Sequence, residues 1–367
     1  MYTKMTTKSM KKIKVKRRYI VLLIFLIIVL FIRHVAWASL WYSLYFYPFF
    51  SWCLSYTSRF WAFSLGDLFI AISVTVLVSA WGIRRLLNRR NRISKKKLLG
   101  YEVEYLLWIY VWFYLSWGIN YSQPNFYKRA KVNAAPYSEA AFRSFVDDYV
   151  HDLNVSYCPV KGKHTETVRR EVLAAYRKMG KGFGINPPGE DAPPVKRMMF
   201  PRLISSVGVT GYMGPFFAEY NLNSDLLPIN YPFTYAHEFS HWLGITNESE
   251  ANLYAYFACT HSRVRSVRYS GYFSILGYVL SNARRIYKPA EYKNLRSSIL
   301  PQIRYQYDVD NAYWRGKYST IIGGAQDYIY DFYLRNNNMP SGLQSYSEVI
   351  NLILSCRANK TNKYLNE

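Results

Sequence analysis

Residues 235–252, YAHEFSHWLGITNESEAN, hold two histidines and three glutamates and decide how the chain is interpreted. His237 and His241 are four positions apart, so on a helix their side chains share one face. Two neutral imidazoles with this spacing can bind one zinc ion, and Glu238 lies beside them, where a general base is needed. The alternative is an ordinary helix with two surface histidines, because this short pattern also arises by chance.

The residues that follow supply candidates for a third metal ligand. Gly244 can end the first helix in a left-handed conformation. Asn247 suits the N-cap of a second helix, with Glu250 as its reciprocal capping partner. In that helix Glu248 shares one side with small residues, which let the two helices approach closely. We therefore predict that Glu248 is the third zinc ligand, with Glu250 as the alternative.

Three other side chains near this segment have weaker signals. Tyr269 and Tyr272 are candidates for donating a hydrogen bond to a developing oxyanion. Packing in the core is the favoured alternative for both, because the chain has 36 tyrosines. Glu219, in the stretch FFAEYNLN, is interpreted as a charge on a strand face.

Three apolar runs in the first third of the chain predict membrane-spanning helices. The predicted spans cover residues of about 19–36, 65–83 and 103–119. Their length and aromatic flanks suit a bilayer and its interfaces. The first run is also compatible with a cleaved signal peptide, because Ala36 and Ala38 resemble a small-x-small cleavage site.

The net charge of +24 is concentrated beside these apolar runs. Lys4–Arg18 and Arg84–Lys97 each hold eight basic residues. Basic residues next to a span mark its cytoplasmic end and attract anionic lipids. They therefore favour contact with a lipid bilayer over binding to nucleic acid, for which no motif is present. The expected topology places the N-terminus in the cytoplasm and everything after about Tyr121 outside it.

The four cysteines, Cys53, Cys158, Cys259 and Cys356, have no metal-binding spacing. A disulfide among the last three is compatible with a location outside the cytoplasm. Buried free thiols are equally compatible with the sequence.

The expected fold class is mainly α (α+β), with a membrane domain over residues 1–124 and a zincin-like domain over 125–367. Glycines mixed with alternating aromatic residues predict one or two short strands within 207–223. Within that region GPFFAEYN, residues 214–221, is interpreted as a strand edge on which an extended peptide can pair. Helical spacing of apolar residues and capping signals predict helices at Ser138–Leu153, Thr165–Met179, Thr234–Leu243, Asn247–Thr260, Tyr269–Asn282 and Ser345–Leu354.

The zinc-binding segment resembles that of the gluzincins. In that group an Asn-Glu-x-x-x-Asp segment supplies a metal-binding glutamate and an aspartate that orients a ligand histidine. The matching residues here are Asn247, Glu248 and Asn252, so the resemblance implies that Asn252 lies behind a ligand histidine. Two differences are present: Asn replaces Asp at 252, and the gap between His241 and Glu248 is shorter than in most gluzincins.

Nearly the whole chain resembles a bacterial membrane-protein family known as domain of unknown function 3810. The resemblance implies three N-terminal spans, the zinc motif and a location in the bacterial cytoplasmic membrane. It rests on the stretches FSLGDLFI, SWGINY, GPFFAEYNLN, HEFSH to ESEAN, RYSGY, YDFYLRNN and GLQSYSEV.

We expect a membrane-anchored zinc metallopeptidase that acts on a peptide or protein substrate, with Glu238 as general base. The metal site is expected on the extracytoplasmic side of a multi-pass membrane protein. The alternative is a non-catalytic envelope scaffold or assembly protein that keeps a structural or vestigial zinc site. A structural site does not need Glu238, so its presence favours the enzyme.

Overall fold

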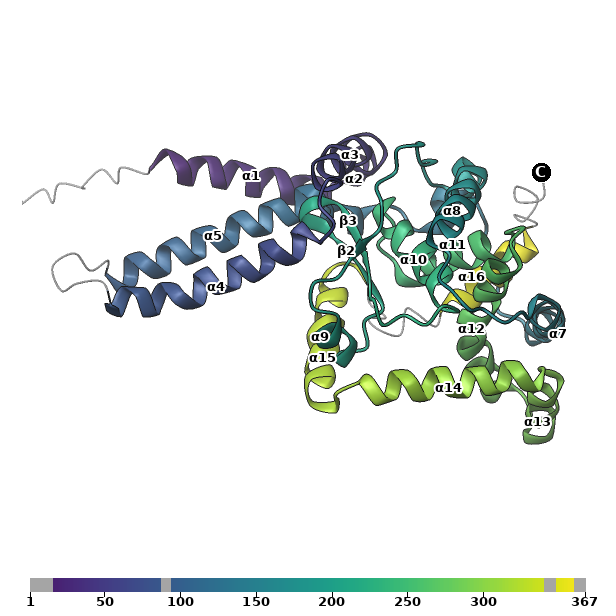
Figure 1. Cartoon of the computed structure of the whole chain (residues 1–367). Helices are drawn as coiled ribbons and strands as arrows, with labels where there is room; N and C mark the ends of the chain where they lie inside the picture. The colour runs from purple at the N-terminus through teal and green to yellow at the C-terminus, as the bar shows by residue number, and fades with distance from the viewer. Residues whose placement is uncertain (1–15, 87–93, 340–347, 360–367) are drawn as a thin grey trace, which may run out of the picture.

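The computed structural model describes residues 16–86, 94–339 and 348–359. They form a mostly helical molecule with one small three-stranded sheet, which confirms the expected predominance of helices. Three long helices project as an arm from a wider part, which holds the sheet and most of the other helices (Figure 1).

The arm consists of α1 (Arg17–His34), α4 (Leu65–Leu86) and α5 (Lys95–Ser116). Among the described helices, α4 by itself is long and apolar enough to cross a bilayer, in agreement with the second predicted span. α1 passes this test only together with the helix that follows it, and the pair is bent by 96°. α5 begins with three lysines and contains two glutamates, which lower its apolar content. The first and third predicted spans are therefore helices, and their crossing of a membrane stays a prediction.

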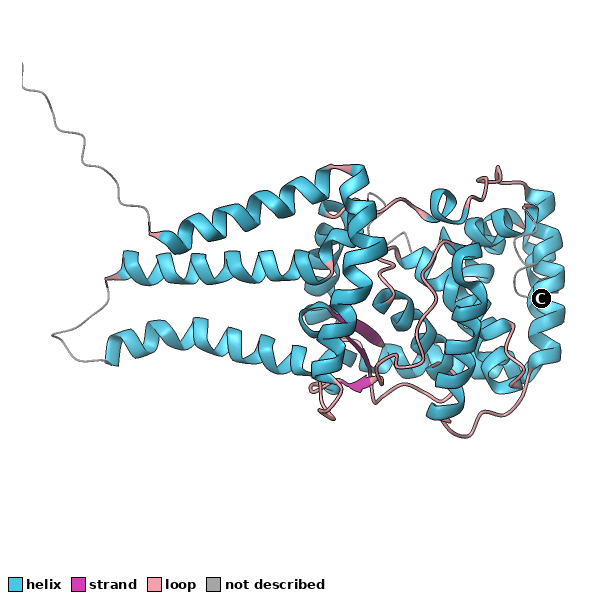
Figure 2. Ribbon diagram, turned by 90° about the horizontal axis from the view of Figure 1, so that it is seen from above, coloured by secondary structure: helices cyan, strands magenta, loops and turns pink. Residues whose placement is uncertain are grey.

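A helical segment runs across the base of the arm, at nearly a right angle to it (Figure 2). We call it the crossing helix, Ala36–Ser58; it contains α2 (Ala36–Trp41), one π-helical turn and α3 (Tyr47–Ser58). The buried hydroxyl of Tyr47 donates a 2.8 Å hydrogen bond to the carbonyl of Trp242. The crossing helix is thereby tied to the helix that carries the two motif histidines.

The sheet contains β1 (Lys196–Arg197), β2 (Gly211–Gly214) and β3 (Glu219–Leu222), in the order β1-β3-β2. β3 pairs parallel to β1 and antiparallel to β2, and a 3₁₀ turn at Pro215–Phe217 joins β2 to β3. The prediction of short strands within 207–223 is confirmed. The prediction that GPFFAEYN offers a strand edge is wrong, because β3 is the central strand and is paired on both sides. The two edge strands of the described sheet are β1 and β2.

Glu219 is a buried anchor at the base of the arm, which corrects its interpretation as a simple strand-face charge. Its carboxylate accepts hydrogen bonds from the backbone N–H groups of Leu65 (3.2 Å) and Gly66 (3.0 Å). The Nζ atom of Lys196 lies 3.5 Å from the same carboxylate. The first N–H groups of a helix have no partner within the helix and carry partial positive charge. Glu219 therefore fixes the start of α4 to the sheet.

The core of the wider part is built around α11 (Glu248–Thr260), all of whose residues are buried. It packs against α10 (Tyr231–Trp242) and α12 (Arg265–Ile286). The surrounding helices are α7 (Glu139–Ser156), α8 (Thr165–Met179) and α16 (Val349–Ala358).

The predicted helices of this core are confirmed, with shifted ends. The bounds of α8 are as predicted, whereas α12 extends four residues beyond its predicted range at each end. α10 begins three residues earlier than predicted, because Pro232 is accommodated in its first turn. The predicted start of the last helix, Ser345, lies outside the described residues.

Five further helices of the wider part were not predicted. Three of them begin with a proline in the first turn, a start signal that the sequence offers. The start of α15 lies beside the end of α9, where the N–H of Ser319 donates to the carbonyl of Ser206 at 2.8 Å. The five helices are α6 (Phe126–Ala130), α9 (Pro201–Ser206), α13 (Pro289–Ser298), α14 (Pro301–Lys317) and α15 (Thr320–Asn336).

All four cysteines are free thiols. Cys259 and Cys356 are buried, whereas Cys53 and Cys158 are partly exposed. This arrangement agrees with the free-thiol alternative for all four positions.

Candidate metal centre

α10 places both motif histidines on one face, one helical turn apart. The ring centroids of His237 and His241 are 4.8 Å apart, with nearly perpendicular ring planes. Their Nε2 atoms approach to 3.1 Å. The expected sharing of one face is therefore observed, and both side chains present the same ring nitrogen to one point.

The chain reverses directly after α10. Gly244 has a φ of +93°, and its N–H donates to the carbonyl of His241 at 2.9 Å. A side chain at Gly244 would be strained by this φ and would lie 3.1 Å from the Tyr47 ring. Asn247 then caps α11, because its Oδ1 accepts the N–H of Glu250 at 3.0 Å. The predicted turn and N-cap are both present.

The turn brings Glu248 back to the two histidines. Its Oε2 atom lies 3.1 Å from Nε2 of His237 and 3.3 Å from Nε2 of His241. We call these three atoms the donor triangle. Tetrahedral zinc with bonds of about 2.0–2.1 Å requires donor atoms roughly 3.3 Å apart, so the triangle fits such an ion. Glu248 and His241 are buried, while the His237 side chain keeps 12% of its surface exposed.

A second layer of contacts holds each corner of the donor triangle. Nδ1 of His241 lies 2.6 Å from the carbonyl oxygen of Ile245, which can only accept, so Nδ1 carries a hydrogen and the neutral imidazole has its lone pair on Nε2. Nδ1 of His237 lies 2.9 Å from Oδ1 of Asn252. This is the contact that the gluzincin resemblance implies for Asn252. Such outer contacts orient metal ligands and increase metal affinity.

The electrostatics of the triangle favour a positive charge at its centre. Burial opposes a charge on His241, but the adjacent Glu248 carboxylate outweighs burial and raises the imidazole pKa to about 9. Burial likewise opposes a charge on Glu248, yet the two imidazoles hold its pKa well below the usual range. These groups therefore attract a proton or a cation, and together they could hold a metal ion.

Glu238 lies next to the triangle but makes no comparable contact. Its Oε2 atom is buried and has no hydrogen-bond partner within the described part of the chain. Burial raises its pKa to about 7, although the two histidines act to lower it. β2 passes directly against this carboxylate, because a Cβ atom at Gly211 would lie 2.5 Å from its Oε1 atom. The requirement for glycine at position 211 was not predicted from the sequence.

Glu250, the alternative ligand, is engaged elsewhere. Its carboxylate accepts the N–H of Phe126 at 2.6 Å and forms a 2.6 Å ion pair with Arg129. Both members of the pair are almost fully buried. Only one of the two predicted capping hydrogen bonds is therefore present: Asn247 accepts from the N–H of Glu250. The Glu250 side chain does not return to Asn247 and pairs with Arg129 instead. The structure brings Glu248, and not Glu250, to the histidines.

The two candidate oxyanion donors do not join the triangle. The hydroxyl of Tyr269 donates to Gln306 at 2.7 Å, and that of Tyr272 donates to Asp152 at 3.1 Å. Instead, the structure adds Tyr330, whose hydroxyl donates to Oε1 of Glu248 at 2.8 Å. Tyr330 was not predicted from the sequence, because it lies on α15, 82 positions after its partner.

We expect about one zinc ion per purified chain. Substitution of Glu248 and of Glu250 should affect this zinc content differently. Glu248→Gln should lose the zinc, because a neutral amide oxygen is a poor ligand, and His241→Ala should lose it as well. Glu250→Gln should keep the zinc but lower the free energy of unfolding by about 3 kcal/mol, since Arg129 remains buried without its partner. Metal analysis and denaturant unfolding measure both effects. Zinc loss in Glu250→Gln with retention in Glu248→Gln would show that the third ligand is wrongly assigned.

Tyr330→Phe should weaken zinc binding by a factor of about ten, because Glu248 loses the donor that orients it. Tyr328→Phe is the matched control, since this tyrosine lies on the same helix and is 77% exposed. Competition with a chromogenic chelator measures both affinities. Equal affinities in the two variants would contradict a supporting role for Tyr330.

Comparison with known proteins yields a family but no characterised relative. The model of the family described as "Protein of unknown function (DUF3810)" matches residues 42–354, a range that includes the donor triangle and Glu238. No curated protein and no solved structure matches the chain. Because the match covers most of its length, the chain belongs to the DUF3810 family of proteins of unknown function.

Proposed function

We propose that this protein is a membrane-anchored, zinc-dependent peptidase. The observation that carries the proposal is the donor triangle, with edges of 3.1 to 3.3 Å, beside Glu238, whose buried Oε2 atom has no hydrogen-bond partner among the described residues. A structural zinc site normally has four protein ligands, whereas a catalytic site has three and one open position. Three donors and a nearby carboxylate oxygen without a partner therefore favour a catalytic site over the structural or vestigial site of a scaffold protein.

The donor set itself favours zinc. Two imidazole nitrogens and one carboxylate oxygen suit zinc, whereas magnesium and calcium take oxygen ligands. Zinc bound by His237, His241 and Glu248 would polarise a substrate carbonyl and lower the pKa of a bound water.

Glu238 would supply the proton transfers of peptide hydrolysis. It would accept a proton from the water that attacks the carbonyl carbon, and then donate it to the amine as the carbon–nitrogen bond breaks. The buried Oε2 atom of Glu238, which has no hydrogen-bond partner among the described residues, is available to take this proton and to give it up again. The other contacts of the triangle keep the histidines and Glu248 oriented during these steps.

The position of β2 favours an extended polypeptide as the substrate. It is the edge of the described sheet on the side away from β1, and its Gly211 lies against Glu238. A peptide that adds to this edge through main-chain hydrogen bonds would pass beside the general base. Because Gly211 has no side chain, the backbone of β2 can lie close to the Glu238 carboxylate without displacing it.

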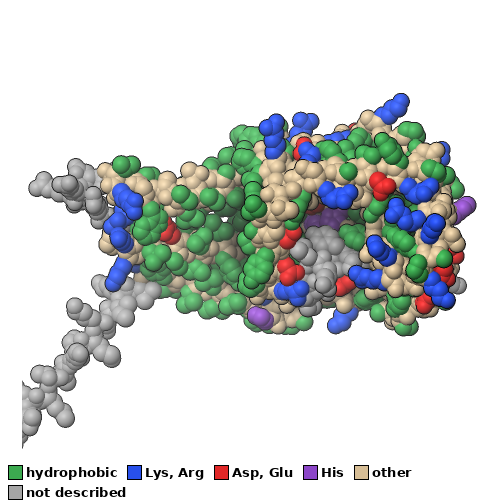
Figure 3. All heavy atoms as spheres, turned by 90° about the horizontal axis from the view of Figure 1, so that it is seen from below, with side chains coloured by type: hydrophobic (Ala, Val, Ile, Leu, Met, Phe, Trp, Pro, Cys, Tyr) green, Lys and Arg blue, Asp and Glu red, His purple; other side chains and the backbone are tan. Residues whose placement is uncertain are grey.

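We also infer that α1, α4 and α5 all cross the cytoplasmic membrane of a bacterium. Basic residues gather at the far end of the arm, at the start of α1, the end of α4 and the start of α5 (Figure 3). They include Arg17, Arg84, Arg85 and Lys95–Lys97. Basic residues remain on the cytoplasmic side. The metal centre, at the opposite end of the arm, is then extracytoplasmic.

Glu238→Gln should reduce hydrolysis of an unfolded protein such as casein by a factor of about a hundred or more, at unchanged zinc content. The amide keeps the shape of the side chain but cannot accept the proton. Glu190→Gln is the matched control, because Glu190 is 94% exposed. Full activity in Glu238→Gln would show that the base is another group.

A topology reporter should give opposite results at two fusion points. Alkaline phosphatase fused after Glu367 should be active, because this enzyme folds only outside the cytoplasm. The same reporter fused after Leu86, at the basic end of α4, should be inactive. Activity after Leu86 together with inactivity after Glu367 would reverse the proposed orientation.

A further inference from the structure

We propose that the crossing helix and α15 lie on the bilayer surface, on either side of the arm, so that the lipid interface borders the metal centre. The inference rests on the proposed placement of the arm in the membrane. It assigns lipid contact to two helices of the wider part that do not themselves span the bilayer.

The crossing helix has one face that is unusual for contact with water. Aromatic rings recur along it every three or four residues, and between 42% and 69% of each is exposed. The opposite face is buried against the ends of α5 and α10. Amphipathic helices with this pattern lie in the interface between headgroups and acyl chains, where Trp and Tyr are enriched. The exposed rings are Trp37, Trp41, Tyr45, Phe49, Trp52 and Tyr56.

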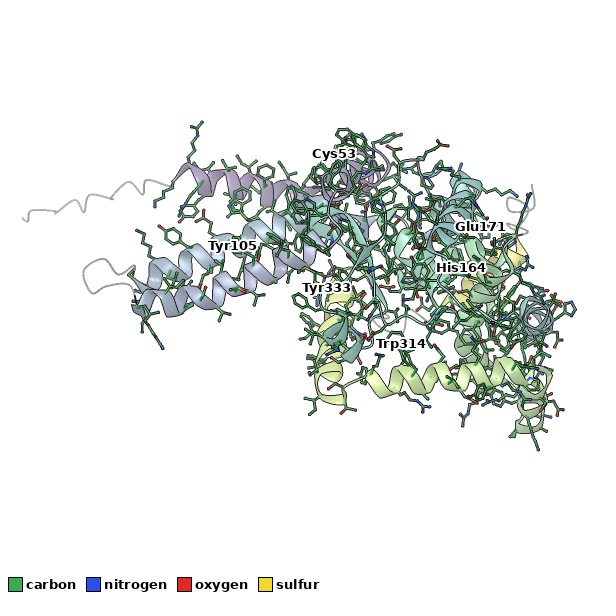
Figure 4. All side chains as sticks on the ribbon, in the orientation of Figure 1. Cys53, Tyr105, His164, Glu171, Trp314 and Tyr333 are labelled. Carbon is green, nitrogen blue, oxygen red and sulfur yellow. The ribbon has the colours of Figure 1, made fainter. Side chains whose placement is uncertain are left out.

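α15 has the same division into two faces. On its inner face, Tyr330 donates to Glu248, and the Tyr333 ring lies 5.8 Å from that of Tyr121. Tyr333 is labelled in Figure 4. The outer face is apolar, and between 49% and 84% of each of its large side chains is exposed. An apolar face of this size on a water-exposed helix marks an interaction surface. Its residues are Ile321, Ile322, Tyr328, Ile329 and Phe332.

The position of both helices along the arm identifies the bilayer as their partner. α15 lies at the side of the wider part that adjoins the arm, and it runs across the direction of the arm (Figure 1). The crossing helix runs across the arm on the other side (Figure 2). Apolar side chains also continue from the arm onto the adjoining edge of the wider part (Figure 3). The two faces are therefore continuous with the surface that enters the membrane.

The length of α4 sets the level of the bilayer surface. Its 22 residues extend about 33 Å, close to the roughly 30 Å of a hydrocarbon core. When α4 fills the core, the membrane surface lies at its first residue, Leu65. The crossing helix ends at Ser58, only seven positions earlier. Because Glu219 holds the start of α4 to the sheet, the wider part cannot move away from this surface.

Nitroxide labels test the proposal in the full chain, reconstituted in nanodiscs of phosphatidylethanolamine and phosphatidylglycerol. Single labelling sites are made by Phe49→Cys and Tyr328→Cys, in a background in which Cys53→Ser and Cys158→Ser remove the accessible thiols. Collision with oxygen, which concentrates in lipid, is compared with collision with a water-soluble nickel chelate. Zinc content serves as the check that each variant is folded.

Two further labels serve as controls. Tyr305→Cys is matched to Tyr328→Cys, because the two tyrosines are 74% and 77% exposed. Tyr305 lies near the start of α14, the end of that helix away from the arm (Figure 1). Val78→Cys reports on the arm itself, since Val78 is 72% exposed on α4. We expect the labels at 49, 78 and 328 to favour oxygen, and the label at 305 to favour the nickel chelate.

Each other outcome overturns a defined part of the proposal. Labels at 49 and 328 that behave like the label at 305, with oxygen still favoured at 78, would reject the surface contact and leave the membrane arm intact. A label at 78 that favours the nickel chelate would reject the membrane placement of α4, and the surface contact with it. Labels at 49 and 328 shielded from both reagents would indicate a second protein copy on these faces, which also rejects lipid contact.

Discussion

The tight turn at Gly244 is the constraint on which the rest of the site depends. In this chain two consecutive helices deliver three donor atoms to one point because the chain reverses within a few residues, and the φ of +93° at Gly244 permits this reversal. Residues from other parts of the chain also contact the turn. The ring of Tyr47 packs against Gly244, and the side chain of Gln123 donates a hydrogen bond to the Gly244 carbonyl at 2.5 Å. The crossing helix and the end of the arm therefore belong to the same packed unit as the donor triangle.

Four buried glutamates show how the protein distributes charge. A buried carboxylate is costly unless it has a partner of opposite charge or several hydrogen-bond donors. Glu219 has the start of α4 and Lys196, Glu250 has Arg129, and Glu248 has two imidazoles and a tyrosine hydroxyl. Glu238 differs from these three. Its Oε2 atom has no hydrogen-bond partner among the described residues, and burial raises its pKa. This contrast within one molecule is the strongest structural argument for a chemical role of Glu238.

The arm and the metal centre are connected through short, specific contacts. Glu219 joins α4 to the sheet, and β2 of the same sheet passes against Glu238. Tyr47 joins the crossing helix to the end of α10. α15 contacts a metal-ligand candidate on one side and exposes apolar residues on the other. A membrane in contact with the outer face of α15 would lie on the other side of the helix whose Tyr330 holds Glu248.

The sequence by itself determined what depends on near neighbours along the chain. The four-residue spacing of His237 and His241, the glycine turn and the cap at Asn247 are local patterns, and each was found as predicted. They were sufficient to favour Glu248 over Glu250, because the angular position of a residue on a helix follows from its number.

Tertiary structure decided what depends on pairing between distant segments. It made β3 the central strand, so the available edge is β2 and not GPFFAEYN. It turned Glu250 to Arg129, 121 positions away, and brought Tyr330 to Glu248. Helix ends and helical faces are encoded by local periodicity and capping, whereas strand order and the partners of buried charges emerge only when the elements pack together.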